Sequence, residues 1–313
     1  MSRGLLTTAA LDALGSPRLW AIGLAGFLAR GGILLFALPV MVLPSIVGLT
    51  TFVGPNSVTA AGLAPGFVVL IALTTFTIAA VVILGTLVGT VTERALVDAI
   101  VVGDEGDAGR RGLVADTPGL ASLVAIRLLA LVPVGLIVAV GGVRLGQVGY
   151  QELVLPSDST APFVIRVLLG APEVTVALVL AWLLTELMAA VAVRLALIDR
   201  RSIPGAVGGA LVWIARRPLR SLAVLTATTV GSVVVVGPAL VTGTIAWLGV
   251  RTVLLGASEP GVALGYVVLF VASWLGALVL AGVAAAWRSA ALSLVVMEDL
   301  RVGGPPAFGG GTL

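Results

Sequence analysis

The sequence predicts an all-α polytopic membrane bundle of six transmembrane helices, arranged as three tandem parallel two-helix repeats. Apolar residues make up 59% of the 313 residues and charged residues only 11%, against roughly a quarter charged in soluble domains. Apolar stretches of about 20 residues, the length that a helix needs to cross a bilayer, recur along the chain. Pro17, Pro118 and Pro218 open three of these stretches at intervals of 101 and 100 residues. Length, composition and spacing therefore agree on a repeated membrane protein.

An arginine lies near the end of each repeat. Arg94, Arg194 and Arg288 follow the second apolar stretch of each unit, at intervals of 100 and 94 residues. Because each repeat holds two spans, every repeat starts on the same membrane face, and the repeats are parallel rather than inverted. The expected repeats are residues 4–102, 103–201 and 202–302. Together they form a single membrane domain over 1–302, followed by a Gly/Pro-rich tail, 303–313, that we expect to be disordered.

The apolar stretches, together with the prolines and polar residues that bound them, predict the order of the elements. Pro65, Pro172 and Pro260 open the second span of each unit, which suits proline because an N–H in the first helical turn has no intrahelical partner. Residues 4–16 and 205–217 are too short to span, and we expect them to form amphipathic helices along the inner interface. The polar residues 103–111 are expected to form a solvated loop. The six spans are expected at 18–48, 66–93, 119–142, 173–197, 219–248 and 262–288.

The arginines predict the orientation. Thirteen lie in the stretches 1–18, 94–118, 194–220 and 288–313, whereas three lie on the opposite face. The positive-inside rule therefore places both termini in the cytoplasm, with the protein in the plasma membrane. The net charge of +3 comes from arginines at helix ends, not from one basic domain. We therefore expect membrane lipids as partners and no nucleic acid.

The residue types that are absent limit the possible chemistry. The chain has no Cys, no His and no Lys, so all eighteen basic residues are Arg. Disulfides, thiolate metal sites and a cysteine nucleophile are excluded. Without His the chain lacks the commonest general base at neutral pH, and without Lys it cannot form a Schiff base. No Walker, dinucleotide-binding or Gly-x-Ser-x-Gly motif is present. We expect a protein that is not an enzyme and that holds no metal or cofactor.

Charged residues inside the predicted spans are the candidate functional residues, since such groups are expensive in a bilayer. Arg127 lies nine residues after Pro118, about 13 Å along a helix, and Glu186 lies eight residues before Arg194, about 12 Å from the same face. Their spans are antiparallel, so we predict an ion pair between Arg127 and Glu186, with Arg30 as a third candidate. Such a pair either orients the helices or belongs to a path for an ion, a proton or an anionic substrate.

Two further patterns concern helix packing and resemblance. Gly85 and Gly89 form a GxxxG match, which permits close helix approach. The linker 193–201, the segment 205–214 and the step 215–222 resemble a unit in bacterial six-span proteins related to the membrane domain of glycerophosphoryl diester phosphodiesterases. In that unit a span ends in an Arg and an acidic turn, a surface helix follows, and an Arg-Arg-Pro step opens the next span. Asp98 and Glu298–Asp299 occupy the acidic turn here, but Pro118 lacks the flanking arginines.

This resemblance implies a noncatalytic membrane module, because the phosphodiesterase catalytic domain is missing. We therefore expect an integral membrane protein without catalytic activity that acts as a scaffold, regulator or partner subunit. Its partner would be another membrane protein or a second copy of the chain. The alternative is a transporter or channel for a small solute or lipid, in which the charges at membrane depth line the path.

Overall fold

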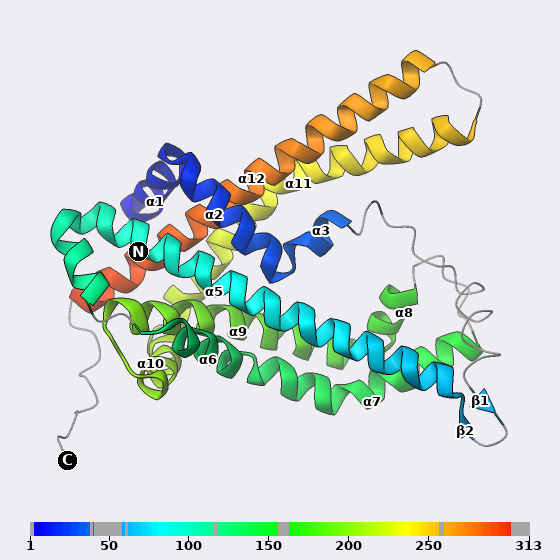
Figure 1. Ribbon diagram of the computed structural model, residues 1–313, viewed down its shortest axis with the longest axis horizontal. Helices are drawn as coiled ribbons and strands as arrows, with labels where there is room; N and C mark the ends of the chain where they lie inside the picture. The colour runs from blue at the N-terminus through cyan, green and yellow to red at the C-terminus, as the bar shows by residue number, and fades with distance from the viewer. Residues whose placement is uncertain are drawn as a thin grey trace. The chain divides into compact units, whose positions relative to one another are not determined.

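Long helices dominate the computed structural model, which describes residues 3–37, 40, 58–59, 62–115, 118–155, 163–256 and 260–301 (Figure 1). One short antiparallel pair, β1 (Val58–Thr59) and β2 (Gly62–Leu63), places Val58 opposite Leu63. The helical elements are α1 (Arg3–Gly15), α2 (Pro17–Phe27), the π-helical turn η1 (Leu28–Gly32), α3 (Ile33–Ala37), α5 (Pro65–Ala115), α6 (Leu120–Ala130), α7 (Val132–Val154), α8 (Phe163–Gly170), α9 (Pro172–Ile198), α10 (Ile203–Arg216), α11 (Pro218–Leu255) and α12 (Pro260–Arg301).

Six helical stretches are long and apolar enough to cross a membrane, which confirms the predicted all-α class and the number of candidate spans, whereas the arrangement in tandem repeats stays a prediction. Their large apolar side chains are widely exposed, as in Phe76 (72%) and Val140 (77%), and an apolar surface of this extent is suited to lipid. These features indicate a multi-pass membrane protein. The stretches are Pro17–Ala37, Val68–Val101, Leu120–Glu152, Pro172–Ile198, Pro218–Leu254 and Gly261–Arg301.

Proline positions agree with the sequence prediction. Pro17 and Pro218 are the first residues of α2 and α11, and Pro65, Pro172 and Pro260 are the first residues of α5, α9 and α12. A proline at that position gives up no intrahelical hydrogen bond, because the N–H groups of the first turn have no carbonyl partner. Pro118 differs, since it lies two residues before α6 begins at Leu120.

One boundary differs from the sequence prediction, and another lies partly outside the described residues. The candidate span that begins at Pro17 is described as far as Ala37, and residues 38, 39 and 41–48 of the expected first span lie outside the described residues. The predicted loop at 103–111 was wrong, since α5 continues as helix to Ala115. That segment contains no proline and several good helix formers, so its glycines are tolerated at about 1 kcal/mol each. The tail 303–313 lies outside the described residues.

The chain groups into two compact units. The first comprises Met1–Val40, Gly85–Leu129 and Leu187–Leu313, and the second comprises Met41–Leu84 and Ala130–Glu186. The division into one membrane domain with three sequential repeats stays a prediction.

Within the first unit, α12 packs against α1, α2 and α11. Small residues allow this packing, because the buried core contains Ala277, Ala281 and Ala284 beside Phe36 and Val236. Short side chains let helix backbones approach closely in a membrane, where dispersion contacts rather than water exclusion hold helices together.

Within the second unit, α7 packs against α8. A Cβ on Gly141 would lie 2.4 Å from Cγ1 of Val174, and one on Gly170 would lie 2.5 Å from Cγ1 of Val148. Thr185 donates a hydrogen bond from Oγ1 to the carbonyl oxygen of Ala130 at 2.8 Å, which ties α9 to the end of α6.

Candidate functional site

A buried carboxylate surrounded by arginines forms the centre of the first unit. Glu93, on α5, is 3% exposed. Its Oε1 accepts a hydrogen bond from Nη1 of Arg194 at 2.7 Å, and its Oε2 accepts one from Nη1 of Arg30 at 3.1 Å and another from Nη2 of Arg127. One carboxylate therefore holds three guanidinium groups from η1, α6 and α9. We call Glu93, Arg30, Arg127 and Arg194 the central charge cluster.

Arg194 is the most completely bonded member of the central charge cluster. Its Nη1 donates to Glu93 and, at 2.7 Å, to the carbonyl oxygen of Ala190, while its Nε donates to Oγ of Ser293 at 3.0 Å. Its Nη2 donates to the carbonyl oxygen of Ser289 at 3.0 Å and to the hydroxyl of the same residue at 2.9 Å. These contacts use all five N–H donors of a guanidinium. Arg194 is wholly buried and links α9 to α5 and α12.

Arg30 reaches Glu93 from a break in the first candidate span. Its backbone lies at φ −85° and ψ 18°, and Gly31 has a φ of +100°, a left-handed conformation that glycine adopts without steric penalty. The resulting kink makes the π-helical turn η1. The Arg30 side chain turns back along α2, where its Nε donates to the carbonyl oxygen of Gly26 at 3.0 Å.

Three glycines bring α5 close to the helix that carries Arg30. A Cβ on Gly85 would lie 2.4 Å from the carbonyl oxygen of Ala29, and one on Gly89 would lie 3.1 Å from Cγ of Arg30. On the opposing helix, a Cβ on Gly26 would lie 2.6 Å from Oγ1 of Thr92. Gly85 and Gly89, which form the GxxxG match in the sequence, therefore lie at a close helix contact within the chain.

Three of the candidate arginines named from the sequence lie in one cluster. Arg30, Arg127 and Arg194 lie together around Glu93, whereas Arg94 forms an i,i+4 pair with Asp98 at 3.8 Å. Glu186, on α9, is half-buried in the second unit. The pairing of Arg127 with Glu186 therefore stays a prediction, and Glu93 is one partner of Arg127 within the first unit. Arg288 is half-buried on α12.

Sequence reasoning missed Glu93 because this residue stood at the expected end of the second span. A signal was nevertheless available. Glu93 and Arg194 are 101 residues apart, the same interval that separates Pro17 from Pro118. Arg127 also lies on the span that directly follows the one carrying Glu93, and consecutive spans run antiparallel.

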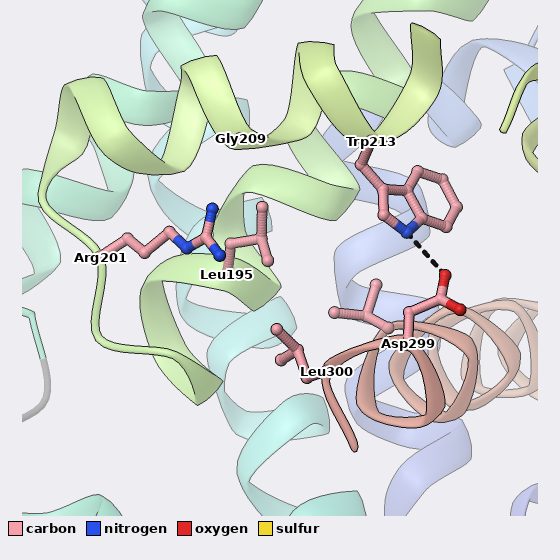
Figure 2. A pocket seen from close by; sticks show the side chains of 7 residues that line it. Leu195, Arg201, Gly209, Trp213, Asp299 and Leu300 are labelled. Atoms are coloured by element: carbon pink, nitrogen blue, oxygen red, sulfur yellow. Dashed lines mark hydrogen bonds between the residues drawn. The ribbon is translucent and has the colours of Figure 1, made fainter. Parts of the chain in front are cut away.

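A second charge cluster ties α10 and α11 to the end of α12. Asp299 accepts a hydrogen bond from Nε1 of Trp213 at 2.7 Å, a second from Nη1 of Arg220 at 2.5 Å, and a third from Arg217. Arg220 also pairs with Glu298. Figure 2 shows the Trp213 indole pointing from α10 toward the Asp299 carboxylate.

The gap beside this second cluster is too small for a ligand. Its volume is sufficient for about one water molecule. Figure 2 shows the side chains around it converging from α9, α10, α12 and the turn before α10. The lining residues are Leu195, Arg201, Gly209, Trp213, Val296, Asp299 and Leu300. It is a packing gap between helices.

The chemistry open to the central charge cluster is electrostatic. Both carboxylate oxygens of Glu93 already accept hydrogen bonds from guanidinium groups, so this residue is not positioned to act as a general base. Within the described ranges no group of three or more His, Cys, Asp or Glu residues could hold a metal ion. The cluster can join helices, and it can attract an anion.

Comparison of the chain with protein-family models, with curated proteins and with solved structures finds no match. The resemblance of the linker 193–222 to phosphodiesterase-related membrane proteins accordingly stays a prediction.

Proposed function

We propose that this protein is an integral membrane protein without catalytic activity, which acts as a scaffold, regulator or partner subunit. The observation that supports this proposal is the complete bonding of Arg194, whose five N–H donors all bind groups on α5, α9 and α12. An arginine used in this way holds helices together and has no donor left for a substrate. Ion pairs that fix the arrangement of helices are an established use of buried charge.

The same contacts support three tandem two-helix repeats. Glu93, Arg194 and Ser293 are separated by 101 and 99 residues, and Arg194 bonds directly to both of the others. Asp98, Asp199 and Asp299 recur at intervals of 101 and 100 residues just beyond them. Equivalent positions of the three proposed repeats would thus meet at one point, as expected for parallel repeats around an axis along the membrane normal.

We also propose that α1 and α10 are the amphipathic helices that precede the first and third repeats on the inner face. Each leads directly into a proline-initiated helix, α2 or α11. The buried residues of α10 are Ala206, Gly209, Ala210 and Trp213, spaced at three and four residues along one face, as in a helix that lies on a surface.

The orientation is testable with reporter fusions. With both termini cytoplasmic, fusions at Ser57, Ser157 and Ser258, which follow the first, third and fifth spans, should all report the outer side. These three positions lie outside the described residues, so the prediction depends on the arginine distribution. A cytoplasmic signal at any one of them would contradict the six-span topology.

The alternative function, a transporter or channel for a small solute or lipid, is favoured by the convergence of three arginines on one carboxylate within the candidate spans. Flux measurements in proteoliposomes distinguish the two proposals. If the protein is a scaffold, chloride and phosphate flux should stay at the level of protein-free vesicles. Native mass spectrometry of extracted membrane patches should then find the chain in a complex of fixed stoichiometry. A protein-dependent flux that is lost in Arg30→Gln would instead establish transport.

A further inference from the structure

The central charge cluster has a net positive charge, and this holds even if Arg127 is left out of the count. Among the described residues, Glu93 is the acidic partner of both Arg30 and Arg194, so two guanidinium groups share one carboxylate. All three residues lie within candidate spans. An excess cation at membrane depth is expensive, and a bound anion would offset that expense.

Arg30 is the member of this group that can still receive an anion. Its side chain is 25% exposed, whereas that of Arg194 is wholly buried. Its Nε donates to Gly26 and its Nη1 donates to Glu93, and no described residue accepts a hydrogen bond from Nη2. Three of the five N–H donors of Arg30 are therefore available.

Arg30 lies close in sequence to exposed apolar residues. Ile33 and Leu34, which begin α3 just after the kink at Arg30 and Gly31, are 58% and 59% exposed. A guanidinium fork matches the oxygens of a phosphate, which it binds through two parallel hydrogen bonds. Adjacent apolar side chains are suited to acyl chains.

We propose that Arg30, held in place by Glu93 and the π-helical turn, binds a phosphate group, either in the headgroup of an anionic phospholipid or as free inorganic phosphate. Arg194 contributes positive charge behind it without leaving its own partners. Gly31 and Gly89 shape the site, since the first permits the kink that exposes Arg30 and the second leaves room for its side-chain stem.

The test measures thermal unfolding of the full chain in nanodiscs. Discs of phosphatidylglycerol are compared with discs of phosphatidylcholine, each with and without millimolar inorganic phosphate. The wild-type protein should be stabilised in phosphatidylglycerol, and titration of this lipid into phosphatidylcholine discs gives an apparent affinity. In Arg30→Gln this affinity should fall by about tenfold or more, the effect of losing charge-assisted hydrogen bonds. Arg30→Lys, which keeps the charge without the fork, should give an intermediate value.

The matched control is Arg18→Gln, which removes the same charge from an exposed arginine at the start of α2 and should leave the affinity unchanged. Stabilisation by phosphatidylglycerol alone assigns a lipid headgroup, while equal stabilisation by phosphate in phosphatidylcholine discs assigns the free anion. Equal losses in Arg18→Gln and Arg30→Gln would reduce the effect to surface charge and overturn the proposal. A wild-type protein that responds to neither phosphatidylglycerol nor phosphate would overturn it without any variant. Because no flux is measured, the outcome is independent of the proposed scaffold function.

Discussion

Glu93→Gln is expected to lower the free energy of unfolding by about 3–5 kcal/mol, the usual consequence of removing one partner from a buried ion pair. The glutamine has nearly the shape of the glutamate, so packing around α5 is preserved. Its amide carries no charge, however, and three guanidinium groups would lose their shared counter-ion. The loss should appear as a lower midpoint of thermal unfolding in detergent.

The matched control for Glu93→Gln is Glu173→Gln. Glu173 pairs with Arg144 at 3.3 Å, and the two side chains are 60% and 50% exposed, so this pair is worth at most about 1 kcal/mol. Similar losses in the two variants would show that Glu93 does not organise the first unit. Glu186→Gln adds a test of the pairing predicted from the sequence. If it matches the loss of Glu93→Gln, then Arg127 depends on Glu186 as much as on Glu93.

Gly282→Ala is expected to destabilise the protein by about 1–3 kcal/mol. This is the opposite of the usual effect in a helix, where alanine has a higher helix propensity than glycine. A Cβ at Gly282 would lie 2.6 Å from the carbonyl oxygen of Trp20, and one at Gly23 would lie 2.6 Å from the carbonyl oxygen of Gly282. The obstructing atoms belong to backbone, which cannot rotate away as a side chain can. The added methyl group must therefore push α2 and α12 apart.

The control for Gly282→Ala is Gly276→Ala on the same helix, because a Cβ at Gly276 would meet nothing within 4 Å. This change should be neutral or stabilise the protein by about 0.4–1 kcal/mol, since alanine restricts the unfolded chain. Thermal unfolding of both variants compares the same chemical change at two sites. Effects of the same sign and size would mean that α2 and α12 are not in backbone contact.

The parts of the fold that depend on apolar length and on proline chemistry could be predicted from the sequence. Each of the six spans contains enough apolar residues to cross a bilayer, and Pro17 and Pro218 start helices where proline gives up no hydrogen bond. The end of α5 could not be placed in this way. A polar segment of good helix formers can either form a solvated loop or continue a helix, and its composition does not distinguish the two. Residues 103–111 continue α5.

The central charge cluster could be predicted only in part, because depth along a helix axis does not determine which helix lies opposite. Arg127 and Glu186 were expected at similar depth, whereas the contact of Arg127 with Glu93 in the first unit was not expected. That contact depends on helix rotation and on glycine contacts such as that of Gly89 with Arg30. Neither of these can be read from hydropathy.

The bonding of Arg194 has a consequence for how the chain assembles during synthesis. The partners of Arg194 on α12, Ser289 and Ser293, are made 95 and 99 residues later. At about 5–20 residues per second, the ribosome needs roughly 5–20 s to produce them. During that interval Glu93 and Ala190 are the available partners of this arginine, and three of its N–H donors lack their final acceptors. The insertion of α12 is thus the step that completes the hydrogen bonding of a helix inserted earlier.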